Sequence, residues 1–390
     1  MMLRTYKYRL RPTPEQDQRL DFLLWQSRTV YNAALEQRIR SYKETGQGIG
    51  YRTQWTHFRD MRREHPETLG QVNASSLQHL LRRLDKSYAA FFRRLKAGEK
   101  AGLPRFKSRY RFNSIEYTYG DGCKLRQNEQ GQRRFYVQNV GEIRLCYHRA
   151  IPNRADLKHV VIKRVNGRWY ACLMLELLDP TERKNRTGQQ IGVDVGLRCL
   201  AALSTGELIE NPRWLRESLA KLRCLQRHAS RQVKGSQRQK DTYWRVARLH
   251  ENVANQRVDF LHQLSHRLVA ENDLIAIENL SLGFMNRNRH MSLASHDAGF
   301  GQFRRMLEYK AESAGIRVIA VNPSNTTQVC SGCGSIVPKG LSVRLHTCPD
   351  CGLRLDRDVN AARNILALAL SNPLGRSGQA ITWAVAPCVA

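Results

Sequence analysis

The amino-acid sequence predicts a multidomain protein of mixed α/β and α+β class. Its N-terminal part contains short strand-like segments with a helical segment inserted among them. Its C-terminal part alternates strand-like and helical segments, which is typical of an α/β sheet. A pair of Cys-x-x-C motifs interrupts this second part. A chain of 390 residues is long enough for two or three such domains.

The N-terminal part begins with a strand at residues 3–11, where apolar and polar side chains alternate. A Pro-Thr-Pro sequence ends this strand before a helix expected at residues 15–43, which carries an apolar face. Two more helices are predicted at residues 53–63 and 74–96, the second again with an apolar stripe. The pattern therefore indicates a helical unit inserted into a strand-rich one.

Short strands are expected from residue 112 to residue 178. The clearest hairpin joins residues 159–165 to residues 168–178 through Asn166-Gly167, a dipeptide that favours a tight hairpin turn. Residues 179–189 are charged and lack periodicity, so they are interpreted as a linker.

The C-terminal part opens with an apolar strand at residues 191–197, which is expected to pair with residues 200–203. The segments that follow are long basic helices over residues 212–270, buried strands at 274–278 and 317–321, and a final helix at 357–369. This alternation of strands and helices predicts an α/β sheet. Residues from 371 onward are expected to form a flexible tail.

The charge of the chain points to a nucleic-acid partner. It has 64 Lys and Arg residues against 34 Asp and Glu residues, a net charge of +30, which a polyanion would neutralise. Basic and aromatic residues also interleave, as in residues 91–94 and 105–112. No segment is apolar enough for a signal peptide or a membrane span, and six cysteines are scattered singly. We therefore expect a cytoplasmic protein with reduced thiols.

The four remaining cysteines form two Cys-x-x-C knuckles, Cys330/Cys333 and Cys348/Cys351, each followed by glycine. Four thiolates at this spacing complete a tetrahedral site, so one structural Zn²⁺ is expected. A redox dithiol needs only one such pair. The site has no open coordination position, which favours a role in folding or in binding nucleic acid over a role in catalysis.

Three carboxylates are the candidate catalytic residues. Asp194 interrupts an apolar strand, Glu278 ends another, and Asp358 opens the final helix. A lone acid in an apolar strand is unfavourable unless it is paired or binds a metal. Three acids at adjacent sheet edges would repel one another, and two divalent cations, Mg²⁺ or Mn²⁺, would relieve that repulsion while binding phosphate oxygens.

Asp356 and Asp358 are expected to play different roles at the start of the final helix. If the helix begins just after Asp356, that residue caps its N-terminus. Asp358 then falls on the face that points toward the sheet, with residues such as Ala362 and Ile365. The polar side of the same helix carries Arg357, Asn360 and Asn364.

Several segments resemble the TnpB family of bacterial insertion sequences. The sequences Gly192-Val193-Asp194-Val195-Gly196, Ile277-Glu278-Asn279-Leu280 and residues 356–365 are similar to the three RuvC motifs of that family. The cysteine knuckles stand where the family places its zinc module. Further similar segments, which extend the resemblance over nearly the whole chain except the tail, are residues 30–35, 102–107, 259–264, 297–303 and 307–311.

The resemblance implies an RNA-guided DNA endonuclease related to type V CRISPR effectors. It implies an RNase H-like (RuvC) nuclease fold, a guide RNA from the transposon end, a short adjacent motif read on double-stranded DNA, and one protein per RNA. The domains it implies are a β-barrel wedge at 1–12 and 111–180, a helical recognition unit at 13–110, the nuclease at 189–329 and 352–370, a zinc-binding insertion at 330–351, and a tail at 371–390. Its catalytic acids match Asp194, Glu278 and Asp358.

Residues that contact nucleic acid are expected at Tyr51, Asn73 and Gln78, by their place in the family pattern, and at Arg105 and Phe106. Three other functions stay open from the sequence. They are RNA-guided DNA binding without cleavage, strand transfer by a zinc-containing transposase, and RNA-independent resolution of DNA structures. The presence of all three acids argues against the first.

Overall fold

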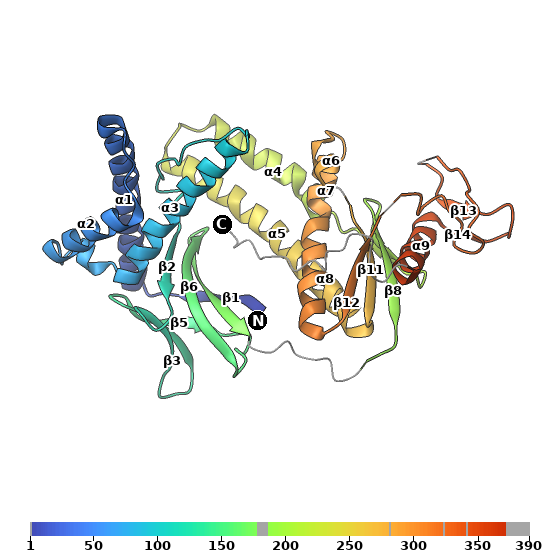
Figure 1. The fold of residues 1–390 in the computed structure, drawn as a ribbon, viewed down its shortest axis with the longest axis horizontal. Helices are drawn as coiled ribbons and strands as arrows, with labels where there is room; N and C mark the ends of the chain where they lie inside the picture. The colour runs from blue at the N-terminus through green and yellow to red at the C-terminus, as the bar shows by residue number, and fades with distance from the viewer. Residues whose placement is uncertain (1, 178–185, 281, 323, 341, 372–390) are drawn as a thin grey trace. The chain divides into compact units, whose positions relative to one another are not determined.

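A computed structural model describes residues 2–177, 186–280, 282–322, 324–340 and 342–371 (Figure 1). The chain separates into two compact units, Met1–Asp179 and Pro180–Ala390. Most of the expected linker and all but the first residue of the expected tail lie outside the described residues. Within the described part of the chain, no helix is long and apolar enough to cross a membrane.

The first unit is built on a seven-stranded antiparallel sheet in the order β2-β6-β7-β1-β5-β4-β3. The two edge strands, β2 and β3, are consecutive in the chain and only residues 119–122 separate them, so the sheet must curl to bring its edges together. Its strands are β1 Met2–Arg11, β2 Ser114–Thr118, β3 Cys123–Gln127, β4 Arg133–Val137, β5 Gly141–Cys146, β6 Ala155–Val165 and β7 Arg168–Leu177.

The expected hairpin of β6 and β7 is confirmed. Asn166 and Gly167 connect the strands with positive φ angles of 46° and 70°, and such a turn matches the twist of the flanking strands. Along β7, Trp169, Ala171, Leu173 and Leu175 are buried in the core of the curled sheet, while the residues that alternate with them are partly exposed.

Three helices accompany the sheet, as expected from the apolar stripes: α1 Pro14–Thr45, α2 Tyr51–Glu64 and α3 Ala74–Lys96. A capping box begins α1, because Thr13 Oγ1 accepts a hydrogen bond from Gln16 N and Gln16 Oε1 accepts one from Thr13 N. Leu20, Leu23 and the stripe of α3 join the same apolar core as the sheet.

The second unit contains a five-stranded sheet in the order β10-β9-β8-β11-β12. The strands β8, β11 and β12 run parallel, whereas β9 and β10 are antiparallel additions at one side. The strands are β8 Gln190–Val195, β9 Cys199–Leu203, β10 Leu208–Glu210, β11 Leu274–Glu278 and β12 Arg317–Val321, and the helices are α4 Trp214–Arg231, α5 Gln237–Glu271, α6 Leu282–Arg287, α7 Ser292–Ala298, α8 Phe300–Ala314 and α9 Arg357–Ser371.

Helices cover both faces of this sheet (Figure 1). On β11, Ile275 and Ile277 pack into a core with residues of α5 and α8, whereas Leu274 and Ala276 pack against α9. This two-sided burial explains why β11 is a continuous apolar run rather than an alternating one.

One strand prediction is partly wrong. β12 has the expected bounds, but it lies at the edge of the sheet, and only Val321 of its five residues is buried. An edge strand has a neighbour on one side only, so it is covered less completely than β11.

Candidate metal centres

Asp194 and Glu278 lie at the same edge of the second sheet. The parallel register pairs Val193 of β8 with Ile277 of β11, so the next residue of each strand is one of the two acids. Carboxyl ends of parallel strands meet at one edge of a sheet. Both side chains are nonetheless buried, with 8% and 9% of the residue surface exposed.

The third acid, Asp358, comes from the first turn of α9. This helix packs directly on β8 at Gly192, where a Cβ atom would come within 2.0 Å of the Ala362 carbonyl oxygen. Asp358 precedes Ala362 by about one helical turn, and Asp194 follows Gly192 by two residues on the same face of the strand. The close contact at glycine therefore aligns the start of α9 with the acidic end of β8.

The electrostatics of the site are those of crowded acids. The pKa of Asp194 is raised well above its usual value by burial, by the charge of Glu278 and by that of Asp358. Burial also raises the pKa of Glu278, although hydrogen bonds with Asp194 and Thr326 act in the opposite direction. Repulsion between two buried carboxylates this close favours a proton on one of them. A bound cation would take the place of that proton.

The donor atoms of the three acids bear on the kind of metal that they would hold. An all-oxygen donor set suits Mg²⁺ or Mn²⁺.

Asp356 and Asp358 have different surroundings. Asp356 Oδ1 accepts a hydrogen bond from Asp358 N at 2.8 Å, which caps the start of α9, and its Oδ2 accepts one from Arg198 at 2.8 Å. Asp358 Oδ2 lies 4.0 Å from the Arg198 guanidinium and within the electrostatic reach of Asp194. The capping contact expected of Asp356 is therefore present, and the catalytic role of Asp358 stays a prediction.

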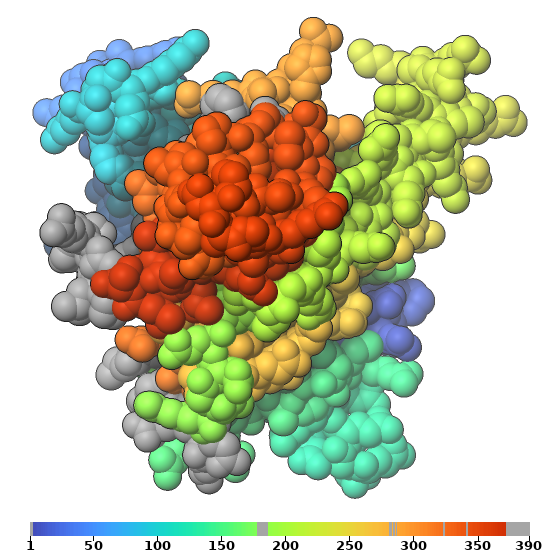
Figure 2. Space-filling model, turned by 90° about the vertical axis from the view of Figure 1, so that its right-hand side faces the viewer, coloured from blue at the N-terminus to red at the C-terminus, as the bar shows by residue number. Residues whose placement is uncertain are grey.

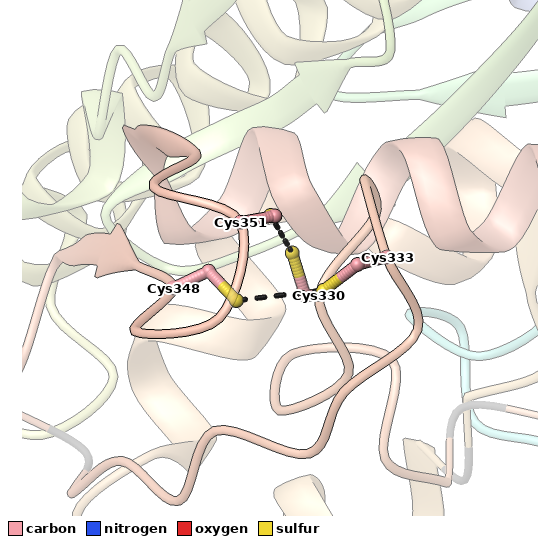
Figure 3. Close-up of side chains that lie close together, drawn as sticks. All are labelled: Cys330, Cys333, Cys348 and Cys351. Atoms are coloured by element: carbon pink, nitrogen blue, oxygen red, sulfur yellow. Dashed lines mark hydrogen bonds between the residues drawn. The ribbon is translucent and has the colours of Figure 1, made fainter.

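The four cysteines converge on one point (Figure 3). Cys330 Sγ lies 3.6 Å from Cys351 Sγ, and Cys333 Sγ lies 3.5 Å from Cys348 Sγ. A tetrahedral zinc site with Zn–S bonds of about 2.3 Å separates its sulfurs by about 3.8 Å, so the side chains already have nearly the required spacing. The second knuckle, Cys348/Cys351, lies between β13 Leu345–Thr347 and β14 Arg354–Asp356, which pair antiparallel.

The polar side of α9 differs from the exposed face that helical periodicity suggests. Arg357, Asn360 and Asn364 are 9%, 0% and 9% exposed. Asn360 Oδ1 accepts a hydrogen bond from Ser331 N, and Asn360 Nδ2 donates one to the Val329 carbonyl. These residues are buried because the loop that carries the knuckles covers them.

Asn364 continues this contact by donating to the carbonyl oxygens of Thr326 and Val329. The hydroxyl of Thr326 in turn lies 3.4 Å from Glu278 Oε1. One short loop therefore contacts a candidate catalytic acid, the final helix and the first cysteine knuckle. In Figure 2 the segment between β12 and α9, coloured orange to red, forms a compact lobe on this face of the unit.

The structural roles of Gly192, Thr326, Asn360 and Asn364 were not predicted from the sequence. The polar residues at positions i, i+3 and i+7 of the short helix α9 could have indicated that this side of the helix is buried.

The five residues expected to contact nucleic acid lie in different environments. Arg105 and Phe106 are exposed, whereas Tyr51 and Gln78 are partly buried. Asn73 is buried as the N-cap of α3, accepting from Ser75 N and Ser76 N and donating to Asp121 and Gln138. Its carboxamide is thus fully used within the protein, which argues against a role in contacting DNA.

Three family models match the chain. A model described as "Cas12f1-like, TNB domain" matches residues 300–365, and one described as "Probable transposase", of the IS605 type, matches residues 173–289. A model described as "Helix-turn-helix domain" matches residues 1–47, where the structure has β1 and the single long helix α1.

The chain is similar to proteins provisionally named RNA-guided DNA endonucleases. One, from Streptomyces pristinaespiralis, is 35% identical over 94% of this chain and 90% of its own length. InsQ of Escherichia coli K12 is 28% identical over 94% of this chain and 92% of its own length. A TnpB-like protein of Acanthamoeba polyphaga mimivirus is 33% identical over 35% of this chain and 27% of its own length.

Solved structures support the same fold. The Cas12f1 chain from a complex with single-guide RNA and target DNA matches with a TM-score of 0.56 and 14% identity, covering 93% of this chain and 98% of that one. The mini RNA-guided endonuclease Cas-phi3 matches with a TM-score of 0.50 and 10% identity, covering 95% of this chain and 92% of that one.

Proposed function

The chain belongs to the TnpB family, and on that premise we propose that it is an RNA-guided DNA endonuclease that cleaves double-stranded DNA beside a short adjacent motif. The observation that carries this proposal is the meeting of Asp194, Glu278 and Asp358 at one sheet edge. They arrive from two parallel strands and a helix whose contact with β8 depends on Gly192.

Asp194, Glu278 and Asp358 would hold two Mg²⁺ or Mn²⁺ ions. Such ions, when bound, supply Lewis acidity toward the attacking water and the leaving oxygen of a phosphodiester. The raised pKa values of Asp194 and Glu278 fit this role, because they mark carboxylates whose charge the protein itself leaves largely unbalanced.

Residues around the acids would position them. The Thr326 hydroxyl orients the carboxylate of Glu278, and Arg198 bridges Asp356 and Asp358 at the start of α9. The cap that Asp356 makes fixes the first turn of the helix and with it the direction of Asp358. These contacts keep the acids in place before DNA arrives.

Guide RNA and target DNA would supply the negative charge that a +30 chain calls for. The exposed pair Arg105 and Phe106 combines a phosphate-binding cation with a ring for stacking. Tyr51 and Gln78 are kept as contacts of the adjacent-motif duplex. We assign the wedge to residues 1–12 and 111–180, the recognition unit to 13–110, and the nuclease to 189–329 and 352–370.

The cysteine module at 330–351 would bind one structural Zn²⁺ through its four thiolates. Through Ser331, Val329 and Thr326 it is linked to α9 and to the loop beside Glu278. Replacing Cys330 with serine should therefore remove one equivalent of zinc and loosen this loop. Metal analysis of the purified variant tests the assignment, and an unchanged zinc content would refute it.

Cleavage and binding are separated by one experiment. The RNA that copurifies with the chain is sequenced, and a matched duplex is incubated with the complex and Mg²⁺. Asp194→Ala should abolish cleavage while guide-dependent binding to the same duplex is retained, because the acid binds metal and the basic surface provides affinity. Ribonuclease treatment of the purified complex, before the duplex is added, should abolish both cleavage and guide-dependent binding. Retained cutting by the variant would exclude Asp194 from the active site, and joined rather than cut transposon ends would indicate strand transfer.

A further inference from the structure

A second group of side chains that could bind a metal lies in the first unit. His79, Glu116 and His159 each offer one ligand atom, and these atoms all lie within 4.8 Å of one another. His79 comes from α3, Glu116 from β2 and His159 from β6, so the group forms only when the helix packs on the sheet.

The strand register explains why two of these residues share a face. Thr118 of β2 pairs with His159 of β6, and Glu116 pairs with Val161, so Glu116 and His159 are diagonal neighbours on the same side of the sheet. The alternate residues Ile115 and Tyr117 point into the apolar core. His79 of α3 contacts this polar side, where it lies beside Glu116 and Thr118.

The contacts of His79 match those of a metal ligand. Its Nδ1 lies 3.5 Å from Glu116 Oε1, and its Nε2 lies 3.0 Å from the hydroxyl oxygen of Thr118. A ligating histidine usually gives its second nitrogen to an oxygen partner that fixes the ring. If the Nε2 proton is donated to Thr118, the lone pair of Nδ1 faces the carboxylate, and two acceptors in that position need a cation between them.

His159 completes the set at close range. Its ring centroid is 5.0 Å from that of His79, and its buried Nδ1 has no hydrogen-bond partner among the described residues. Buried polar atoms of this kind are uncommon unless a ligand or ion satisfies them.

Two cationic side chains, those of Arg82 and Lys86, act on His79. They weaken the attraction for any cation, so the site needs the covalent preference of imidazole for a transition metal and would not hold Mg²⁺.

The geometry points to a second metal site, in which His79, Glu116 and His159 bind one divalent transition-metal ion, Zn²⁺ in particular. Two imidazoles and one carboxylate are a known zinc donor set, and a water completes the coordination. Ligand atoms of a tetrahedral site with bonds of about 2.1 Å lie about 3.4 Å apart, so small side-chain rotations suffice. The ion would join α3 to β2 and β6 and hold the helical layer on the sheet.

Zinc stoichiometry of the full chain, produced without a histidine tag and loaded with ZnCl₂ before desalting, tests the site. The wild-type protein should retain two equivalents, and the double variant Cys330→Ser/Cys333→Ser should retain one. His159→Gln and Glu116→Gln should each lose one equivalent from the wild-type level. His148→Gln, which removes an exposed histidine of the same unit, should lose none.

Cobalt distinguishes the two sites by their spectra. Co²⁺ bound to four thiolates shows sulfur-to-metal charge transfer, which a site of nitrogen and oxygen ligands lacks. The cysteine double variant should therefore bind one Co²⁺ without that band, and the further change His159→Gln should abolish this binding. Circular dichroism verifies that each variant is folded. One zinc per wild-type chain together with none in the cysteine double variant would overturn the proposal, whatever the cleavage assay shows.

Discussion

At the scale of single residues, the burial of Asp194 beside Glu278 links stability to pH. The pKa of Asp194 in the folded protein lies well above its ordinary value of 3.8. The folded state therefore binds the proton more tightly than the unfolded chain does. The contribution of this residue to the free energy of unfolding is present at low pH and is lost as pH rises from the unfolded pKa through the folded one.

Asp194→Asn should consequently be inactive but more stable than the wild type when no divalent ion is added at neutral pH. The amide fills the same space and carries no charge, so it removes the repulsion from Glu278. Melting temperatures measured from about pH 4 to pH 8 should show the gap between variant and wild type widening with pH. Added Mg²⁺ should raise the melting temperature of the wild type only. A gap that does not change with pH would contradict the assignment of the raised pKa to Asp194.

The two aspartates at the start of α9 give a second test. Asp358→Ala should abolish Mg²⁺-dependent cleavage, whereas Asp356→Ala should lower stability by about 1 kcal/mol through the lost cap and leave measurable activity. The measurement is a cleavage time course on a matched target, with melting curves to show that both variants fold. An active Asp358→Ala protein beside a folded but inactive Asp356→Ala protein would reverse the roles.

At the scale of elements, the position of Asp358 depends on how α9 packs on β8. Gly192 allows the helix to approach until the Ala362 carbonyl and the Leu366 side chain occupy the space of a missing Cβ atom. The position of Asp358 relative to Asp194 therefore depends on a glycine that takes no part in the chemistry.

Gly192→Ala should displace the helix and separate Asp358 from Asp194. Overpacking of this kind costs about 1–3 kcal/mol, and here the obstacle is backbone rather than a flexible side chain. Cleavage should fall by more than the loss of folded protein explains, while RNA binding is retained. Gly283→Ala is the matched control, because no atom lies within 4 Å of its added methyl group. Equal activity in the two variants would show that the contact does not align the site.

The polar side of α9 gives a test of the link to the cysteine module. Asn364→Ala should leave the carbonyl groups of Thr326 and Val329 without this donor and lower the free energy of unfolding by about 1–3 kcal/mol. Leu368→Ala, at an exposed position of the same helix, should cost less. Chemical denaturation of both variants provides the comparison, and similar costs would mean that the buried hydrogen bonds do not stabilise the module.

At the scale of the whole molecule, the net charge of +30 governs the affinity for nucleic acid. If a guide RNA contacts about ten phosphates through single-stranded segments, the logarithm of the association constant should fall with the logarithm of salt concentration with a slope of about −7. Filter binding of the copurified RNA over a range of NaCl concentrations measures it. Phe106→Ala should weaken binding and leave the slope unchanged, because stacking releases no counterions. A slope near zero would exclude a mainly electrostatic interface.

Local pattern was enough to predict most elements of both units. Periodicity and turn residues gave the bounds of α3, β11 and β12 and the hairpin turn at Asn166-Gly167, because these depend on residues close in the chain. The edge position of β12 could not be predicted, because it depends on which other strands pair with β12 in the folded chain.

The sequence by itself determined the family resemblance, the paired spacing of the four cysteines and the identity of the three candidate acids, because each of these is read from short motifs whose chemistry is local. Only the tertiary structure decided that Asn360 and Asn364 are buried and that His79, Glu116 and His159 lie together. A helical pattern shows which residues share a face, but it cannot show whether a distant loop will cover that face. Contacts between segments far apart in sequence are set by the path of the whole chain, which no local pattern contains.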